Sequence, residues 1–145
     1  MNNSKAESVK YPIKTQQDGP DGTIIIETQE SESSAKKKEI LFPDGKRITD
    51  DGDGVEVTRY PKGNIEFILP KSKIKVEIRV GSGDDVLESR KALNGKSNEA
   101  MFFKAMYSQL CRFDGQYMIP EDIGRKLPMG DFLTLEQYFA EVNFS

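Results

Sequence analysis

The glycine-rich stretch VGSGDD at residues 80–85 is a natural place to look for chemistry, because glycines between a strand and a helix often cradle phosphate groups. A Walker loop also needs a Lys followed by Ser or Thr, and a dinucleotide-binding loop needs a third glycine inside a parallel βαβ unit. The stretch has neither feature, and the carboxylates of Asp84 and Asp85 would repel phosphate but suit the positive end of a helix dipole. We therefore predict that it only joins a strand to a helix, with Asp85 and Glu88 as a capping box.

Two further features suggest a functional site at first, a calcium-binding loop and a reactive cysteine, but the surrounding residues argue against both. In ITDDGDGVEV at residues 48–57, Asp51 and Asp53 have the spacing of the first two calcium ligands of an EF-hand. The third ligand position falls on Val55 and the twelfth on Lys62, so a polar hairpin loop is the better prediction. Cys111 has no histidine anywhere in the chain to activate it, and its apolar neighbours indicate a small core residue on a helix. The sequence thus predicts no catalytic residue, no metal site and no cofactor, and we expect a protein that is not an enzyme.

The charge and apolar content of the chain limit the classes of partner that we expect. The chain has 145 residues, with 21 Lys and Arg against 24 Asp and Glu, a net charge of −3 that offers no general attraction to nucleic acid or anionic membrane. The first residues lack the apolar core of a signal peptide, and no apolar run approaches the ~18 residues of a membrane span. We therefore expect a soluble, cytoplasmic protein whose partners are other proteins.

The first part of the chain is polar. Residues 1–38 are rich in Ser, Glu, Gln and Lys, a composition that cannot offset its ordering entropy by burial, so we predict a flexible arm. The exception is the run Ile24, Ile25 and Ile26. It is predicted either as an edge strand of the domain or as a strand that joins a partner's sheet, and it is therefore a candidate binding segment.

Residues 39–80 change to a period of two, with short apolar runs separated by PDGKR, PKGN and KSK. These breaks contain the residues that chain reversals need, so the segment is predicted as an antiparallel β meander. In its last strand Ile74, Val76, Ile78 and Val80 should face the core, while the alternating lysines and charged residues face solvent.

From residue 81 onward the period is helical. Helices are predicted from Asp84 through DDVLESRKAL, over residues 98–113, over residues 120–127, and from about Asp131 to residue 142. Strands followed by helices indicate an α+β fold, with an N-terminal antiparallel β meander followed by a small C-terminal helical bundle. Residues 81–145 should pack with the meander as one domain.

The order of motifs in residues 65–144 resembles a known family. IEFILPKSKIKVEIRVGSGDDVLESRKAL is followed by FFKAMYSQLCRFDGQYMIPEDIGRKLPMGDFLTLEQYF. The strand, the glycine turn with aspartate, LCRFDG, ED, LP and a final DFLxL helix are similar to those of bacteriophage tail assembly chaperones. The resemblance implies a non-enzymatic viral protein that binds the helical tape measure protein during phage tail assembly.

Such a role requires a surface for a helical partner. Five aromatic residues of the helical region exceed what a small core needs and are predicted to line an apolar groove, with the last two as its wall: Phe102, Phe103, Tyr107, Tyr138 and Phe139. The alternative is that all five pack internally.

The front half of the chain departs from that family. FPDGK at residues 42–46 and YPKGN at residues 60–64 resemble the one-sheet β repeats of centriolar G-box proteins. An added sheet with an arm also suits a permanent tail or baseplate component, or an adaptor, that joins its neighbours through the meander and the arm. The sequence leaves self-association open.

Overall fold

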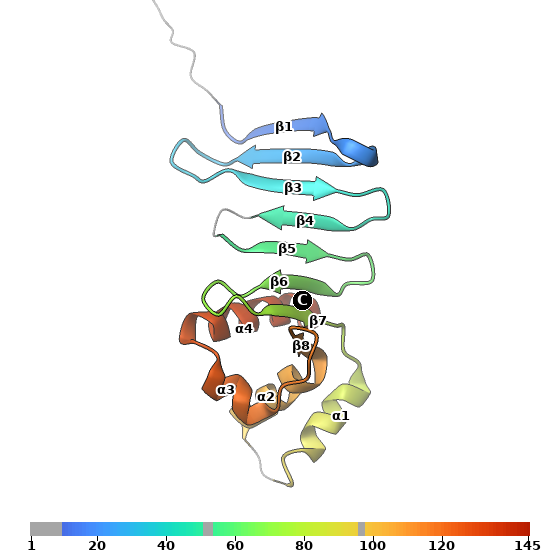
Figure 1. The fold of residues 1–145 in the computed structure, drawn as a ribbon, viewed down its shortest axis with the longest axis vertical. Coiled ribbons are helices and arrows are strands. Elements are labelled where there is room, and N and C mark those ends of the chain that lie inside the picture. Colours follow the sequence, from blue (N-terminus) through green and yellow to red (C-terminus); the bar gives the residue numbers. More distant parts are fainter. Residues whose placement is uncertain (1–9, 51–53, 96–97) are drawn as a thin grey trace, which may run out of the picture.

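The computed structural model describes residues 10–50, 54–95 and 98–145, which form an eight-stranded antiparallel sheet and a layer of helices (Figure 1). The strands pair in chain order. They are β1 Ile13–Asp18, β2 Ile24–Gln29, β3 Lys37–Leu41, β4 Arg47–Asp50, β5 Glu56–Arg59, β6 Ile65–Ile68, β7 Lys75–Ile78 and β8 Cys111–Phe113. The helices are α1 Gly83–Lys91, α2 Glu99–Leu110, α3 Pro120–Lys126 and α4 Met129–Asn143, with a 3-10 turn η1 at Pro20–Gly22. The predicted α+β class, a meander followed by helices, is confirmed.

The meander begins earlier than the sequence suggested. Residues 13–38, predicted as part of a flexible arm, contain β1, β2 and the start of β3, whereas residues 1–9 lie outside the described part. The run Ile24 to Ile26 is a strand of this chain, but it is not an edge, because β2 pairs with both β1 and β3. Backbone pairing orders these strands, and a composition argument based on burial does not detect it.

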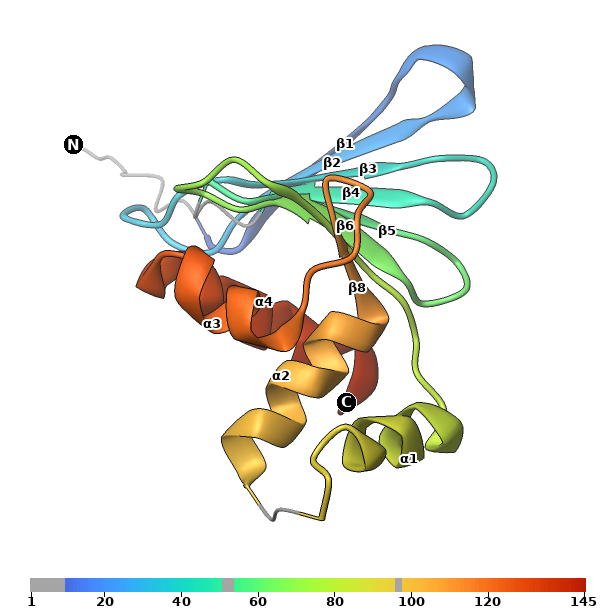
Figure 2. The ribbon, with the colours of Figure 1, turned by 60° about the horizontal axis from the view of Figure 1, so that its bottom comes forward.

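The helices cover one face of the sheet at its C-terminal end (Figure 2). Val57, Phe67, Val76 and Phe113 form a row across β5 to β8, and all four are buried against α2 and α4. Val76 and Ile78 face the core as predicted, whereas Val80 lies beyond the end of β7 and is 47% exposed. The helix predicted to reach Phe113 ends at Leu110, because Cys111 pairs with Ile78 to start β8.

The other end of the sheet has no helical layer. Figure 1 shows β1 to β4 projecting past the helices. No residue of these four strands is buried, although they contain six isoleucines and a leucine. All hydrophobic residues that are buried in the described ranges lie at Val55 or beyond. Half of the sheet is therefore a single layer whose two faces are both partly exposed.

Three turns with a Pro-x-Gly sequence stack along one side of the sheet, at residues 19–23, 42–46 and 60–64. In the second and third, the residue before Pro donates its N–H across the hairpin and also accepts the glycine N–H. All three glycines have positive φ, and the first two face the next turn: a Cβ on Gly22 would lie 3.1 Å from Pro43 Cγ, and one on Gly45 would lie 2.9 Å from Pro61 Cγ. The turns therefore pack proline on glycine.

A buried carboxylate joins the sheet to the helices. Asp131, in the first turn of α4, is fully buried and accepts hydrogen bonds from the backbone N–H groups of Lys71 (2.9 Å) and Ser72 (2.8 Å) in the β6–β7 turn. Burial by itself would raise the pKa of Asp131, but the two N–H donors, the Ser72 side chain and the Lys71 charge together lower it. The charged carboxylate thereby fixes the β6–β7 hairpin over the start of α4.

The stacked turns predict that Gly45→Ala destabilises the protein by about 1–3 kcal/mol, because the new Cβ meets both an unfavourable φ of 93° and the ring of Pro61. Gly54→Ala is the matched control: Gly54 also has positive φ, at 87°, but nothing lies within 4 Å of its Cβ position. Urea unfolding of both variants measures the difference, and equal losses of stability would contradict the stacking.

Candidate functional site

The aromatic residues predicted to line a groove instead form the core of the helical layer. Tyr107, Tyr138 and Phe139 are buried, with ring centroids 4.7 Å apart for Tyr107 and Phe139. Phe102 and Phe103 are partly buried and pack against the same core. The prediction that Tyr138 and Phe139 form the wall of an open groove is therefore wrong, because these rings fill the space between α2, α4 and the sheet.

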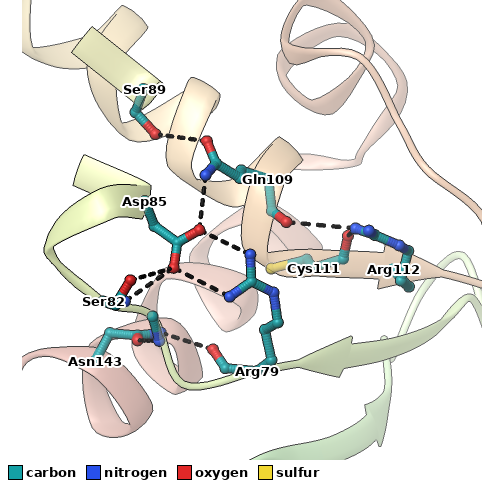
Figure 3. A network of polar contacts seen from close by, with 9 residues as sticks. Arg79, Ser82, Asp85, Ser89, Gln109, Cys111, Arg112 and Asn143 are labelled. Carbon is teal, nitrogen blue, oxygen red and sulfur yellow. Dashed lines mark hydrogen bonds and ion pairs between the residues drawn. The ribbon is translucent and has the colours of Figure 1, made fainter. Parts of the chain in front are cut away.

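The glycine stretch at residues 80–85 connects β7 to α1 through a polar network (Figure 3). Arg79 holds the Asp85 carboxylate with two hydrogen bonds of 2.8 and 3.1 Å, while the Ser82 N–H (2.8 Å) and the Gln109 amide (2.7 Å) donate to the same group. The capping box therefore pairs Ser82 with Asp85, one turn earlier than the predicted Asp85 and Glu88. Both oxygens of the Asp85 carboxylate are engaged within the protein, so the network is structural.

The charges of Arg79 and Asp85 stabilise each other in this network. The Arg79 guanidinium holds the pKa of the Asp85 carboxyl well below its usual range, against the opposing effect of burial, and the Ser82 and Gln109 donors add to the shift. Ser89 donates in turn to the Gln109 side-chain oxygen at 3.3 Å. Asn143, at the C-terminal end of α4, accepts the Gly81 N–H at 2.7 Å. Side chains of α1, α2 and α4 therefore all bind the segment at the end of β7.

Catalytic and metal chemistry find no support in the described residues. Cys111 is fully buried, and burial raises the pKa of its thiol, which therefore stays protonated at neutral pH. No group of three Asp, Glu, Cys or His side chains within residues 10–50, 54–95 and 98–145 is placed to hold a metal ion. Asp51 and Asp53, weighed above as calcium ligands, lie outside the described residues.

The uncovered face beside the helices is the strongest candidate site. Cross-strand partners share a face of a sheet, and the buried Val57 pairs with Thr49, then Glu39, then Ile26. A second row runs from the buried Ile65 through Arg59, Arg47 and Leu41 to Ile24. Ile24, Ile26 and Leu41 thus lie on the face that the helices cover elsewhere. We call these three residues the shelf.

Two ion pairs lie on the side of the shelf that faces the helices. Arg59 on β5 donates two hydrogen bonds of 2.8 Å to Glu141 of α4, which marks where the helical layer ends. This contact is the main reason that the pKa of Glu141 is lowered. Arg47 and Glu39 form a second ion pair, at 3.0 Å, next to Leu41. The shelf is an apolar strip with charged groups along one side, and apolar residues bordered by polar ones are typical of a protein-binding surface.

The opposite face of the sheet is different in character. It carries the row Ile25, Ile40 and Ile48 on β2 to β4, but toward β7 it becomes charged, with Lys75 paired to Glu66 at 3.3 Å. Of the predicted binding run, the structure thus places Ile24 and Ile26 on the shelf and Ile25 on this second face. The sequence could have suggested this division from the period of two, but it gave no sign of which strands the helices leave bare.

Comparison with known proteins adds no relative: no family model, no curated protein and no solved structure matches the chain. None of the helices that the structure describes combines the length and apolarity needed to cross a lipid bilayer.

Asp85→Asn should lower the free energy of unfolding at pH 7 by about 1–3 kcal/mol, because Arg79 loses its charged partner. The folded-state pKa of Asp85 lies below its unfolded value of about 3.9, so its contribution is complete above that value and is lost as the pH falls toward the folded pKa. Denaturant unfolding at pH 7 and pH 3 should show the gap between variant and native protein shrinking at the lower pH. A gap that stays constant would contradict this role.

Proposed function

We propose that this protein is a non-enzymatic assembly protein that binds an amphipathic helix of another protein on its shelf. The observation that carries the proposal is the mismatch between the two layers: the helices cover β5 to β8, while the same face of β2 and β3 keeps Ile24, Ile26 and Leu41 partly exposed. An apolar strip beside an existing helical layer is a site where one more helix would complete the packing.

The dimensions suit one helix. Adjacent strands lie about 4.8 Å apart, so β2 to β4 present a strip roughly 10 Å wide, close to the ~10 Å diameter of a helix with its side chains. A helix docked there would contact the shelf with residues at i, i+3, i+4 and i+7, and it would lie between the Arg59–Glu141 ion pair and β1. The Arg47–Glu39 pair offers both charge signs to the polar flank of that helix.

The resemblance of residues 65–144 to phage tail assembly chaperones supports a tape measure protein as the helical partner. In this proposal the partner binds the front half of the sheet, not the aromatic residues of the helices. The second candidate, a permanent tail or baseplate component, draws support from the single-layer strands β1 to β4, since such strands also suit lasting contacts with a neighbour's sheet.

The shelf predicts a face-specific loss of binding. Ile24→Thr combined with Leu41→Thr, a cross-strand pair on the shelf, should weaken co-purification of a long helical protein about tenfold or more. Ile25→Thr combined with Ile40→Thr is the matched control, because it also replaces an apolar cross-strand pair of the same two strands by threonine, but on the opposite face. Threonine keeps the preference for strand structure in both variants.

Quantitative mass spectrometry of an assembling lysate and of finished particles from the source provides the readout. A helical protein lost with the shelf variant and retained with the control supports the site. If the two variants behave alike, the shelf is not the binding surface. Presence of the chain in finished particles at fixed stoichiometry would favour the permanent component over the chaperone.

A further inference from the structure

The free edge of the sheet is the long strand β1. The Gly19 N–H donates to the Thr23 carbonyl oxygen at 2.8 Å across the β1–β2 hairpin, so the backbone groups of Gly19 point toward β2. Backbone groups alternate in direction along a strand, and those of Lys14, Gln16 and Asp18 therefore point away from the sheet. Along this edge, three residues present hydrogen-bonding groups that no strand of the described chain pairs with.

The opposite edge of the sheet is closed. Strand β8 has three residues, and the Phe113 N–H donates to the Gln116 carbonyl oxygen at 2.8 Å, so the chain folds back over its own edge. An edge covered in this way cannot accept a further strand. A head-to-tail chain of sheets, in which β1 of one molecule pairs with β8 of the next, is therefore disfavoured.

We propose that β1 pairs antiparallel with β1 of a second copy, about a twofold axis at Gln16. In this register Lys14 lies opposite Asp18 of the second copy, and Asp18 opposite Lys14, so two ion pairs of opposite charge flank the central pair of glutamines. All three outward-pointing residues then meet outward-pointing residues of the other strand, as a hydrogen-bonded antiparallel ladder requires. A lysine on an edge usually discourages pairing with foreign strands. Here the second copy supplies the carboxylate that neutralises it.

The rest of the fold leaves room for this dimer. The helices lie over the other end of the sheet, beyond β4, so the two helical layers would be separated by the single-layer strands of both copies (Figure 1). The twofold axis is perpendicular to the sheet, which places both shelves on the same face. The inference goes beyond the proposed function, because self-association can be measured with no helical partner present.

Charge exchange tests the register. Lys14→Asp and Asp18→Lys should each weaken the dimer about tenfold or more, since each single variant sets two like-charged pairs against each other. The double variant Lys14→Asp with Asp18→Lys restores opposite charges and should recover the native dissociation constant to within about threefold. Lys62→Asp, on the exposed β5–β6 turn, is the control for the change in net charge. Sedimentation equilibrium of the full chain measures all four variants.

A disulfide trap tests the axis independently. Copies of residue 16 would face each other as a hydrogen-bonded pair, with Cα atoms about 5.5 Å apart, within the range for a disulfide. Gln16→Cys should therefore form a covalent dimer on mild oxidation. Residue 17 lies opposite Thr15, which places its two copies about 7–8 Å apart, so Gln17→Cys should cross-link far more slowly. The native Cys111 is buried and does not compete.

The outcomes are decisive in both directions. Rescue by the double variant together with selective cross-linking at residue 16 establishes the β1 dimer. The proposal is overturned if the native protein stays monomeric up to about millimolar concentration, measured in 100-fold dilution steps. It is also overturned if neither charge reversal weakens the dimer. Circular dichroism of each variant separates a lost dimer from a lost fold.

Discussion

Burial of apolar side chains between the helices and β5 to β8 is the interaction on which the rest of this structure depends. The row from Val57 to Phe113 and the rings of Tyr138 and Phe139 exclude water at one end of the sheet. Toward the other end, each strand from β4 to β1 is held by hydrogen bonds to its neighbour and by cross-strand contacts. Local stability should therefore decrease from the helices toward β1, since few buried contacts remain there.

Polar side chains hold the connections that leave this core. Asp131 fixes the β6–β7 turn, Asp85 fixes the start of α1, and Asn143 binds the backbone that follows β7. Asp114 does the same for the start of β7, because its carboxylate accepts the Lys75 N–H at 2.9 Å. These carboxylate and amide groups bind main-chain donors, so they set the position of whole segments instead of individual side chains. The helices are thereby oriented relative to the end of the sheet that they cover.

The features that depend on local residue patterns could be predicted from the sequence, whereas those that depend on pairing between distant segments could not. The alternation of Val76 and Ile78, the turns containing Pro43 and Pro61, and the helix after Gly83 are local signals, and the structure has all of them. Strand β1 was missed because IKTQQD has no apolar alternation and is ordered by its pairing with β2. The shelf was missed for a different reason: Ile24 and Leu41 look the same in sequence whether or not a helix covers them. The groove prediction for the aromatic residues rested on their number exceeding the expected core, whereas the sheet beneath them enlarges that core, so Tyr107, Tyr138 and Phe139 follow the alternative of internal packing.

The stacked turns make the sheet adjustable in length. Because the Pro-x-Gly turns recur and both Gly22 and Gly45 face the next turn, one pair of strands could be gained or lost while the proline-on-glycine contacts continue across the junction. The spacing from Phe42 to Tyr60 is the length of one such unit. Each unit would move the free edge about 10 Å farther from the helices. The number of strands, and with it the distance between the free edge and the helices, could therefore change without a change in the helical layer.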